Sequence, residues 1–432
     1  MCYLGAMPHD APIEAASAAL GSLPGVSGEA RRWLVPGRLE VLGKHTDYAG
    51  GRSLLCAAER GICFAAAPRA DAHMRIVDAA TGTDLDFTIG PALRSAPGHW
   101  ANYPMTVARR LARNFPGPLK GADIAFASDL PPAAGMSSSS ALIVGFFAAL
   151  ADMNQLEQRH EYRESIHSPE ELAGYLGSVE NGRSFAGLPG DTGVGTAGGS
   201  EDHTAILCCR AGQLSQYAFC PIRHERTVSL APAWTFAIGV SGVVADKNAT
   251  AREAYNRAAR AVDAIMEAWR AATGRSDLWL AEALAGAPDA PERMREILRA
   301  APAPKRDALL ARLEQFVAES TEIIPEAVDF LARGDVEGIG VLVDRSQRGA
   351  ERWLGNQVPE TIALARNARK LGAAAASAFG AGFGGAVWAL VRTQEADEFV
   401  ERWSREYRAA FPSRAPSSQF FLTNPGTGMH RL

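Results

Sequence analysis

The stretch Asp129-Leu-Pro-Pro-Ala-Ala-Gly-Met-Ser-Ser-Ser-Ser-Ala-Leu142 joins two segments of opposite character. Before it, residues 122–128 alternate in the manner of a half-buried strand. After it, residues 141–153 are mostly apolar and predict a buried helix. Pro131 and Pro132 end the strand, because proline offers no donor to a strand ladder. The segment therefore predicts a strand, a short loop and a helix.

The loop of this unit is built of small residues that lead into the helix. Gly135 permits a backbone turn that other residues resist, and the hydroxyls of Ser137 to Ser140 can cap the helix. The free N–H groups and the dipole of a helix N-terminus favour phosphate, and Mg²⁺ prefers oxygen ligands such as hydroxyls. The loop thus predicts a phosphate site, although a flexible loop or a capped helix start has the same letters. It is not a P-loop, because no Gly-Lys-Ser/Thr follows.

The composition of the 432-residue chain is that of an ordinary globular protein, with 47% hydrophobic and 21% charged residues. Its length suffices for two or three domains. A net charge of -4 gives no basic surface for nucleic acid, and no apolar run approaches the ~20 residues of a membrane span. The N-terminus lacks a secretory pattern, and the 6 cysteines form no C-x-x-C pair. We therefore expect a cytoplasmic protein with reduced thiols and small-molecule partners, without nucleic acid or membrane.

A second segment, residues 36–51, is rich in glycine and in side chains that act on polar ligands: Arg38, Glu40, Lys44, His45, Asp47 and Tyr48. Such a mixture is not typical of a core strand, and its glycines indicate close approaches of the backbone. We interpret the segment as a loop that contacts a ligand. The alternative is a polar turn between strands, with Glu40 and Lys44 as a surface pair.

A third segment joins a predicted helix to a glycine-rich loop. Glu180 lies near the helix C-terminus, where an acidic side chain is unfavourable unless a cation offsets it. Residues 193–198 match the dinucleotide fingerprint by letter, but no clear strand precedes them and residues 204–209 predict a strand instead of a helix. Asp202, just before that predicted strand, is interpreted as a carboxylate directed into a cleft, with a turn-capping role as the alternative.

The second half of the chain predicts one more glycine-rich block among helices. Residues 305–330 predict a helix that Pro325 breaks. The block Gly380-Ala-Gly-Phe-Gly-Gly385 precedes a predicted strand at residues 386–392. No internal repeat is present, so the chain is not a repeat protein.

Four separated blocks resemble, in order, the signature blocks of galactokinase, a small-molecule kinase of the GHMP superfamily: residues 36–51, 130–142, 180–202 and 380–385. Minor matches agree at Trp100-Ala-Asn-Tyr103, Ala254-Tyr-Asn-Arg257 and Val358-Pro-Glu360. The resemblance covers nearly the whole chain. Its first block, with Gly-x-x-x-x-x-Gly-x-His-Thr-Asp-Tyr-x-Gly-Gly, is more specific to galactokinase-like enzymes than the serine loop.

This resemblance implies a two-domain α+β kinase with mixed and antiparallel sheets and an active site in the cleft between the domains. The implied N-terminal domain spans residues 1–225, and the C-terminal, ferredoxin-like α+β domain spans residues 226–432. The implied reaction is ATP-dependent phosphorylation of the anomeric hydroxyl of D-galactose, with Mg²⁺ as cofactor.

The implied site residues form four groups. Asp202 would be the base or orienting group at the anomeric hydroxyl, with Arg38 beside it, since a cation favours the ionised carboxylate that can accept a proton. The sugar contacts would be Lys44, His45, Asp47 and Tyr255. The nucleotide contacts would be Trp100, Pro132, Gly135, Met136, Ser137, Ser138, Ser139, Ser140 and Ala141, although Trp100 could equally cover the core. Ser139 and Glu180 would hold Mg²⁺.

Several residues depart from the usual galactokinase pattern. Glu40 stands where Asn is usual, and Lys44 stands where a sugar-contacting Glu is usual; Glu201 and His203 flank Asp202 where Met and Gln are usual. Lys44 admits three interpretations. It points away and pairs with Glu40, it donates to a neutral hydroxyl of galactose, or it faces the carboxylate of a uronic acid such as galacturonate.

Two alternative functions therefore stay open. The chain could be a related sugar 1-kinase acting on a uronic acid or L-arabinose. It could also be a regulator that binds sugar and ATP without turnover. The presence of Arg38, Ser139, Glu180 and Asp202, the reacting groups of the family, favours an enzyme.

Overall fold

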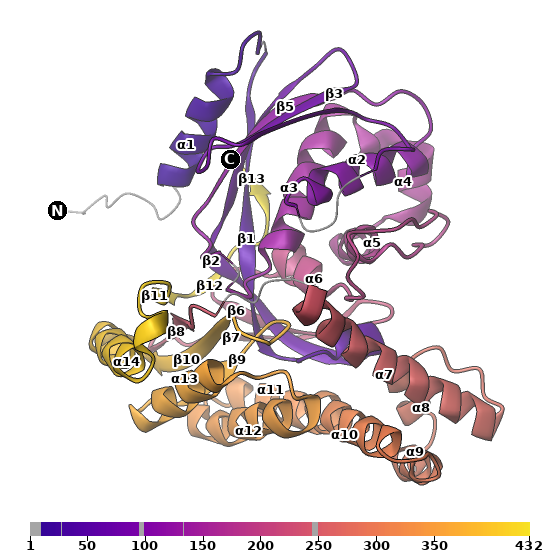
Figure 1. Cartoon of the computed structure of the whole chain (residues 1–432), viewed down its shortest axis with the longest axis vertical. Coiled ribbons are helices and arrows are strands. Elements are labelled where there is room, and N and C mark those ends of the chain that lie inside the picture. The colour runs from indigo at the N-terminus through magenta and orange to yellow at the C-terminus, as the bar shows by residue number, and fades with distance from the viewer. Residues whose placement is uncertain (1–9, 27, 95–98, 133, 244–248) are drawn as a thin grey trace.

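The computed structural model describes residues 10–26, 28–94, 99–132, 134–243 and 249–432. Two sheets organise it (Figure 1). The first has nine strands in the described residues and the second has four. The α+β class predicted from the sequence is confirmed.

Two long antiparallel strands form the spine of the first sheet, β1 (Arg31–Leu42) and β2 (Arg52–Pro68). The short helix η1 (Asp47–Ala49) lies between them in the chain. The other strands on this sheet include β3 (His73–Asp78), β4 (Asp84–Thr88), β5 (Ala122–Ser128), β6 (Gln213–Ala218) and β7 (Arg223–Ser229). β5 pairs with β2 antiparallel and with β3 parallel, so the sheet is mixed.

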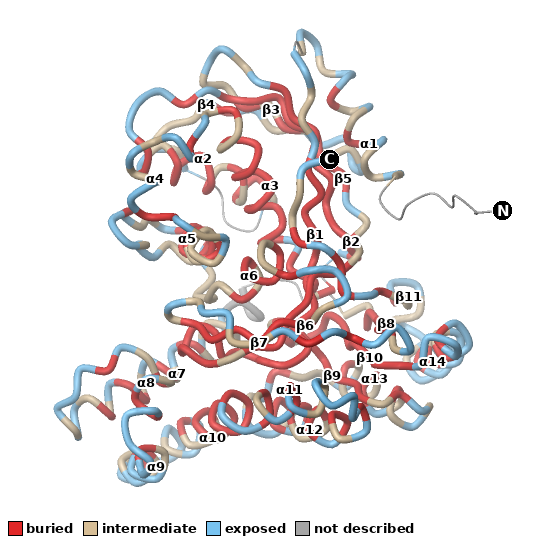
Figure 2. The backbone as a smooth tube through the Cα atoms, turned by 180° about the vertical axis from the view of Figure 1, so that it is seen from behind, coloured by how far each residue is buried: buried red, intermediate tan, exposed pale blue. Residues whose placement is uncertain are grey.

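Helices cover both faces of the first sheet. α1 (Asp10–Gly21) lies on one face, while α3 (Ser138–Met153) lies against β1 and β2 on the other (Figure 1). α3 is buried almost along its whole length, which explains its apolar sequence (Figure 2). Around it lie α2 (Asn102–Asn114), η2 (Leu156–Gln158), α4 (His160–Ser165), α5 (Pro169–Asn181) and α6 (Glu201–Cys208).

The second sheet is antiparallel, with the strand order β11-β8-β10-β9. Its strands are β8 (Trp234–Val240), β9 (Ala375–Ala378), β10 (Ala386–Arg392) and β11 (Gln419–Thr423). α13 (Pro359–Lys370) and α14 (Ala396–Ala410), with η5 (Thr393–Glu395) and η6 (Pro412–Arg414), accompany it. The chain order is strand, helices, two strands, helix and strand, which is the order of a ferredoxin-like unit.

A helical region extends from the second sheet (Figure 1). It contains α7 (Ala249–Thr273), α8 (Leu280–Ala285), α9 (Ala290–Arg299) and α10 (Lys305–Val317). These helices share a hydrophobic core that also includes Tyr48 and Ala49 of η1. The block that holds the polar residues 44–48 is therefore fixed against the second half of the chain.

The predicted break at Pro325 is wrong. α10 continues through the π-helical η3 (Ala318–Ile323) into α11 (Ile324–Ala332), with Pro325 in the first turn of α11. A proline removes one backbone donor and crowds the preceding turn, and here a wider π-helical turn precedes it. α12 (Val336–Gly349) likewise continues into a π-helical segment, η4 (Ala350–Leu354).

The strand predicted at residues 204–209 is also wrong, because residues 204–208 belong to the helix α6 and Cys209 directly follows it. A short apolar run fits either element by periodicity, and here it packs against α5 and β1. One reason given against the dinucleotide fingerprint therefore fails. The other stands, because the element before residues 193–198 is the helix α5 and no β-strand.

The end of the chain returns to the first sheet. β12 (Pro425–Gly426) pairs with β2, and β13 (His430–Arg431) pairs with β1. β7 also belongs to the first sheet, although it extends past the predicted domain boundary between residues 225 and 226. The division of the chain into residues 1–225 and 226–432 thus stays a prediction. None of the helices in the described ranges is both long and apolar enough to cross a membrane.

Candidate functional site

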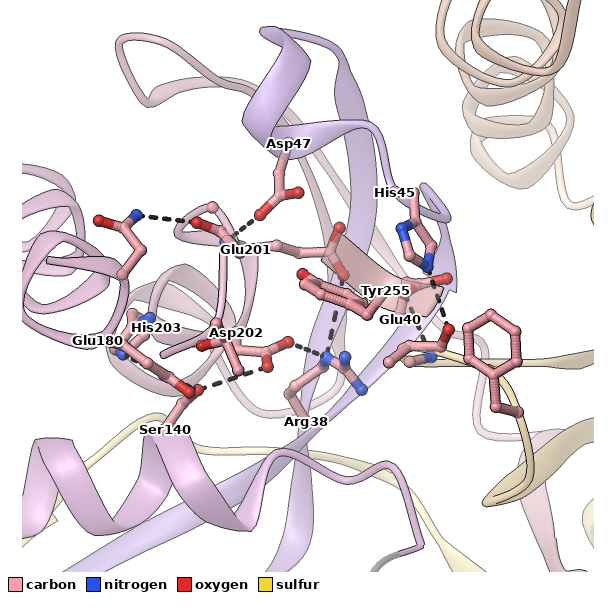
Figure 3. A pocket seen from close by; sticks show the side chains of 18 residues that line it. Arg38, Glu40, His45, Asp47, Ser140, Glu180, Glu201, Asp202, His203 and Tyr255 are labelled. Atoms are coloured by element: carbon pink, nitrogen blue, oxygen red, sulfur yellow. Dashed lines mark hydrogen bonds and ion pairs between the residues drawn. The ribbon is translucent and has the colours of Figure 1, made fainter. Parts of the chain in front are cut away.

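A cavity opens where β1, α6, the loop after α5, α7 and the loop after β9 meet (Figure 3). Five carboxylates and four other ionisable side chains lie on its wall: Glu40, Asp47, Glu180, Glu201, Asp202, Arg38, His45, His203 and Tyr255. The backbone of residues 380–383 closes one side. Six of the residues predicted from the sequence to serve catalysis, sugar or metal are therefore brought together, and Lys44 and Ser139 do not line the cavity.

β1 brings Arg38 and Glu40 to the same side, because side chains two positions apart share a strand face. The expectation that residues 36–42 form a loop was wrong, since they continue the buried strand. Gly37 explains the close packing, because a Cβ there would lie 2.7 Å from Leu130 and 2.9 Å from the Met136 carbonyl. The Arg38 N–H donates to that carbonyl at 3.2 Å. The strand therefore lies directly against the serine loop.

Arg38 and Asp202 form the shortest ion pair of the cavity. Arg38 Nε lies 2.6 Å from Asp202 Oδ1, and Arg38 Nη1 donates to the Gly135 carbonyl at 2.6 Å. Burial by itself would lower the pKa of Arg38, but the charges of Asp202, Glu40 and Glu201 raise it above its ordinary value. The guanidinium is thus charged, and it connects the serine loop to Asp202.

Ser140 connects the serine loop to two carboxylates. Its hydroxyl donates to Glu180 Oε2 at 2.7 Å and lies 3.4 Å from Asp202 Oδ2 (Figure 3). His203 Nε2 lies 3.3 Å from the same Glu180 oxygen. Glu180 is held at the end of α5, where the Val194 N–H donates to its carbonyl. A serine of the loop therefore does bond to Glu180, and it is Ser140; the assignment of Ser139 with Glu180 to Mg²⁺ stays a prediction.

The first turn of α3 contains the serines, as predicted, but no serine hydroxyl caps it. Ser137 is left-handed, with φ 61°, and its hydroxyl is buried without a hydrogen-bond partner. Gly135 also has positive φ. The cap prediction is wrong. Ser137 adopts the left-handed conformation, and its hydroxyl forms no hydrogen bond to the first turn of α3. A buried hydroxyl without a partner fits a site for a polar ligand.

The other residues assigned to the nucleotide lie around this loop. Pro132 and Ser138 are exposed, while Met136, Ser139 and Ala141 are buried. Trp100 is half-buried, and its ring meets Phe126 edge-to-face at 5.6 Å. Trp100 therefore packs against the hydrophobic core of the first sheet, and its contact with adenine stays a prediction.

His45 spans the cavity between two halves of the chain. Its Nε2 lies 3.1 Å from the Ala381 carbonyl, and its Nδ1 lies 3.0 Å from the Tyr48 hydroxyl. Burial and the charge of Arg312 lower the pKa of His45 to about 4, so the ring is neutral. The Tyr255 ring lies 4.9 Å away, and burial raises the pKa of the Tyr255 hydroxyl. A neutral imidazole beside a phenol can orient sugar hydroxyls without adding charge.

Lys44 points away from the cavity and is only 1% exposed. Its ammonium donates to the Ser346 hydroxyl at 3.2 Å, and that hydroxyl donates to Glu319 Oε1 at 2.9 Å. The first interpretation of Lys44 was right about its direction but wrong about its partner, and the alternative of a surface pair with Glu40 is wrong. Ser346 and Glu319, its actual partners, lie about 300 residues further along the chain. The local sequence around Lys44 therefore does not predict them.

Glu40 and Glu201 also lie on the cavity wall; Glu40 was predicted only as part of the ligand-contacting segment or as a partner of Lys44, and Glu201 was noted only as a departure beside Asp202. Glu40 is 3% exposed; its Oε2 accepts from the Gly380 N–H at 3.2 Å, and its Oε1 has no partner. Burial raises the pKa of Glu40 to about 7, although Arg38 and Lys44 oppose the shift. Burial and the charge of Glu40 raise the pKa of Glu201 well above its ordinary value. The signal for both was their departure from the usual galactokinase pattern.

The oxygen atoms of Glu180 and Ser140 fit a magnesium ion that a substrate phosphate also binds. Within the described ranges, no group of three or more His, Cys, Asp or Glu side chains could hold a metal by itself. Mg²⁺ is commonly bound through one or two carboxylates together with substrate phosphates. The Glu180 carboxylate and the Ser140 hydroxyl are oxygen ligands of that kind. Of the cysteines, Cys2 lies outside the described residues and the other five are free.

Three family models match the chain. Residues 25–68 match the galactokinase galactose-binding signature, residues 102–199 the N-terminal domain of GHMP kinases, and residues 327–409 the C-terminal domain of GHMP kinases. The galactokinase of Roseiflexus sp. is 28% identical over 383 residues, which is 87% of each chain. The galactokinase of Streptomyces coelicolor is 26% identical over 413 residues, 93% of this chain and 94% of its own.

The fold has a close counterpart among solved structures. Lactococcus lactis galactokinase, solved in complex with galactose, superposes with a TM-score of 0.77 at 20% identity. The superposition covers 96% of this chain and 99% of that one. The two chains share a fold.

Proposed function

The chain belongs to the GHMP kinase superfamily, and on that premise we propose that it is a galactokinase, which transfers the γ-phosphoryl group of ATP to the anomeric hydroxyl of D-galactose. The observation that carries the proposal is the galactose-binding signature at residues 25–68, which includes four residues of the cavity wall, Arg38, Glu40, His45 and Asp47. Phosphoryl transfer depends mainly on positioning and on neutralisation of charge, and the cavity offers groups for both.

Asp202 is the proposed base or orienting group at the anomeric hydroxyl. Arg38 holds its Oδ1 at 2.6 Å, so Oδ2, which has only the long 3.4 Å contact with the Ser140 hydroxyl, is the oxygen proposed to accept the proton of the sugar. The Asp202 side chain is 31% exposed, whereas that of Arg38 is 5% exposed. The carboxylate can therefore reach a substrate while its partner stays fixed. General base catalysis contributes roughly 10²–10⁴-fold to a rate.

The N-terminus of α3 is the proposed phosphate site. Its free N–H groups and its dipole favour the charges of a triphosphate, and the Ser137 hydroxyl has no protein partner to lose. Glu180 and Ser140 would hold Mg²⁺, which when bound neutralises charge on phosphate oxygens. Because both side chains lie beside Asp202, the two substrates would meet at one place in the cavity.

The sugar is proposed to lie between the two halves of the chain. His45 and Asp47 line the cavity from the first half, while Tyr255 and the Gly380–Phe383 loop line it from the second. Asp47 is held by the N–H of Glu201, at 3.1 Å. We propose that the two domains, with their boundary in the chain between residues 225 and 226, meet close to this cleft. Lys44 is not part of the wall, so no observation now favours a uronic acid through that residue.

The test is ADP release by the purified chain with Mg-ATP and a panel of sugars: D-galactose, 2-deoxygalactose, D-galacturonate, D-glucuronate, L-arabinose, D-glucose and no sugar. Turnover on D-galactose above the other members would support a galactokinase. A higher kcat/KM on L-arabinose or a uronic acid would replace the sugar but keep the reaction. ATP binding without turnover on any sugar would favour the regulator and contradict the proposal.

A further inference from the structure

The helix that runs from α10 into η3 presents one row of polar side chains to the segment between β1 and β2. Arg312, Gln315 and Glu319 form this row, because residues three and four positions apart lie on the same helix face. All three are at most 3% exposed. Gln315 Nε2 donates to the Lys44 carbonyl at 2.9 Å, and Glu319 Oε1 accepts from the Gly43 N–H at 2.9 Å. The helix therefore fixes the backbone of this segment one residue after another.

Arg312 makes the next contact of this row, at His45. Its Nη2 donates to the His45 carbonyl at 2.5 Å and to the Tyr48 hydroxyl at 3.3 Å. That hydroxyl lies 3.0 Å from His45 Nδ1. Arg312 thus holds His45 directly at its backbone and, through Tyr48, at its ring.

His45 needs this support, because its backbone takes a conformation that residues other than glycine rarely adopt. Its φ is 58°, in the left-handed region. A residue persists in such a conformation only where the surrounding contacts determine it. The His45 ring lines the cavity, whereas Arg312 does not. A proposed sugar contact is therefore strained at its backbone, and Arg312 bonds to its carbonyl from outside the cavity.

The guanidinium of Arg312 is itself costly to bury. Arg312 is 2% exposed, its Nε has no hydrogen-bond partner, and no carboxylate of the described residues forms an ion pair with it. Its other donors bond to uncharged groups of Gln315, His45 and Tyr48. The rings of Tyr48 and Phe316, centred 5.8 and 5.9 Å away, offset only part of the cost. Because packing alone would favour an uncharged side chain here, the charge indicates a function.

We infer that Arg312 is a positioning residue of the sugar site, which holds the strained backbone of His45 and places a fixed positive charge beside its ring. The inference rests on the proposed sugar kinase activity. The charged and titratable groups that act on the ring are Arg312, Lys44, Tyr48 and Tyr255. Burial and, after it, the charge of Arg312 lower the pKa of His45 to about 4. The ring that faces the sugar is therefore fixed and neutral at once.

The test is Arg312→Gln, measured with the sugar of the panel above that has the highest kcat/KM. Glutamine removes both the charge and the bond to the His45 carbonyl. We expect KM for the sugar to rise roughly 10-fold or more, the effect of a lost charge-assisted hydrogen bond, while KM for ATP stays within twofold. Without the neighbouring cation the pKa of His45 rises, so the loss of kcat/KM at low pH should begin at a higher pH than in the wild type.

Arg312→Lys is the second variant, because it keeps the positive charge at the same place. The loss of kcat/KM at low pH should then begin where it does in the wild type. KM for the sugar should rise less than in Arg312→Gln, since an ammonium can still donate one bond to the carbonyl.

Arg159→Gln is the matched control. Arg159 also donates to backbone carbonyls, and it lies outside the cavity wall. Its substitution removes one guanidinium and the same kind of bond. It should leave KM for the sugar and the pH profile unchanged.

The inference is overturned if Arg312→Gln keeps KM for the sugar within twofold of the wild type, if KM for ATP rises equally, or if the pH profile does not move. If neither variant of Arg312 folds, nuclear magnetic resonance of the wild type decides, with the His45 ring signals assigned through His45→Gln. His45 should stay neutral down to about pH 5, and titration near its ordinary pKa would overturn the inference.

These results leave the kinase proposal intact, because the wild type still turns over the sugar. Absence of turnover on every sugar by the wild type would instead overturn the kinase proposal and, with it, the inference.

Discussion

Arg38 and Lys44 come from one block of sequence, and both are buried, yet they bond to different parts of the molecule. Arg38 faces the cavity and pairs with Asp202, which is partly open to solvent. Lys44 faces the interior and donates to Ser346, which in turn donates to the buried Glu319. The comparison teaches that a buried cation beside a binding site can serve either the chemistry or the packing. The partners decide which, because Asp202 is partly open to solvent and lines the cavity, whereas Ser346 and Glu319 are buried outside it.

The largest expected effect comes from breaking the network on the cavity side. Asp202→Asn keeps the size of the side chain and its contact with Arg38, but an amide cannot accept the proton of the sugar. We expect kcat on D-galactose to fall by roughly 10²–10⁴-fold with little change in thermal stability. Single-turnover kinetics and a melting curve check this. Turnover within threefold of the wild type would contradict the role of Asp202.

Breaking the interior network should have the opposite result. Lys44→Met keeps the aliphatic chain but leaves Ser346 and Glu319 without the ammonium. The free energy of unfolding should fall by about 1.5–3 kcal/mol, the worth of a hydrogen bond to a charged group. The order of preference among the sugars should stay the same, since Lys44 does not line the cavity. Chemical denaturation measures the free energy of unfolding, and the sugar panel measures the order of preference among the sugars. A changed preference would place Lys44 back at the substrate.

The charges of Arg38 and Lys44 both act on Glu40, so the protonation of Glu40 gives a further test of their comparison. Burial raises its pKa from 4.5 in the ordinary state to about 7 in the folded chain. The folded state therefore binds the proton more tightly than the unfolded state, so Glu40 stabilises the fold less as pH rises from about 4.5 through about 7. We expect this carboxyl to lower the free energy of unfolding by about 1–3 kcal/mol across that window. Denaturation at several pH values should show a shallower fall in Glu40→Gln, and identical slopes would contradict the assignment.

The smallest expected effect concerns Ser137, whose buried hydroxyl at the start of α3 has no hydrogen-bond partner. Ser137→Ala removes a hydroxyl that bonds to nothing in the protein, so the stability of the chain without nucleotide should not fall. If the hydroxyl bonds to a phosphate, KM for ATP should rise roughly 2- to 10-fold. Ser404→Ala, at a half-buried serine on α14 outside the cavity wall, is the control. An unchanged KM for ATP would remove Ser137 from the nucleotide site.

Much of the site could be predicted because its residues lie in short contiguous blocks. The strand at residues 122–128 and the helix that follows the serines are in the structure, and Arg38, Glu180 and Asp202 do converge. Residues 36–42 failed as a loop, because the sequence does not tell whether a strand borders a core or a polar cavity. The apolar run before Cys209 was too short to distinguish a helix from a strand.

The details that could not be predicted depend on contacts between distant parts of the chain. The place of Ser140 beside Glu180 depends on the rotation of α3, which the left-handed Ser137 sets at its start. The direction of Lys44 depends on Ser346 and Glu319, which approach it only in the folded chain. Such contacts leave no pattern in the local sequence, whereas a departure from a familiar motif, as at Glu40, shows where to look.

The most direct test of the central claim is the identity of the product. The purified chain, Mg-ATP and D-galactose should give a phosphate monoester on the anomeric carbon, identified by coupling between phosphorus and the anomeric proton in nuclear magnetic resonance spectra. The same product should be almost absent with Asp202→Asn. Phosphate on any other hydroxyl, or a full yield from Asp202→Asn, would contradict the account of the cavity as a sugar 1-kinase site with Asp202 at the reacting hydroxyl.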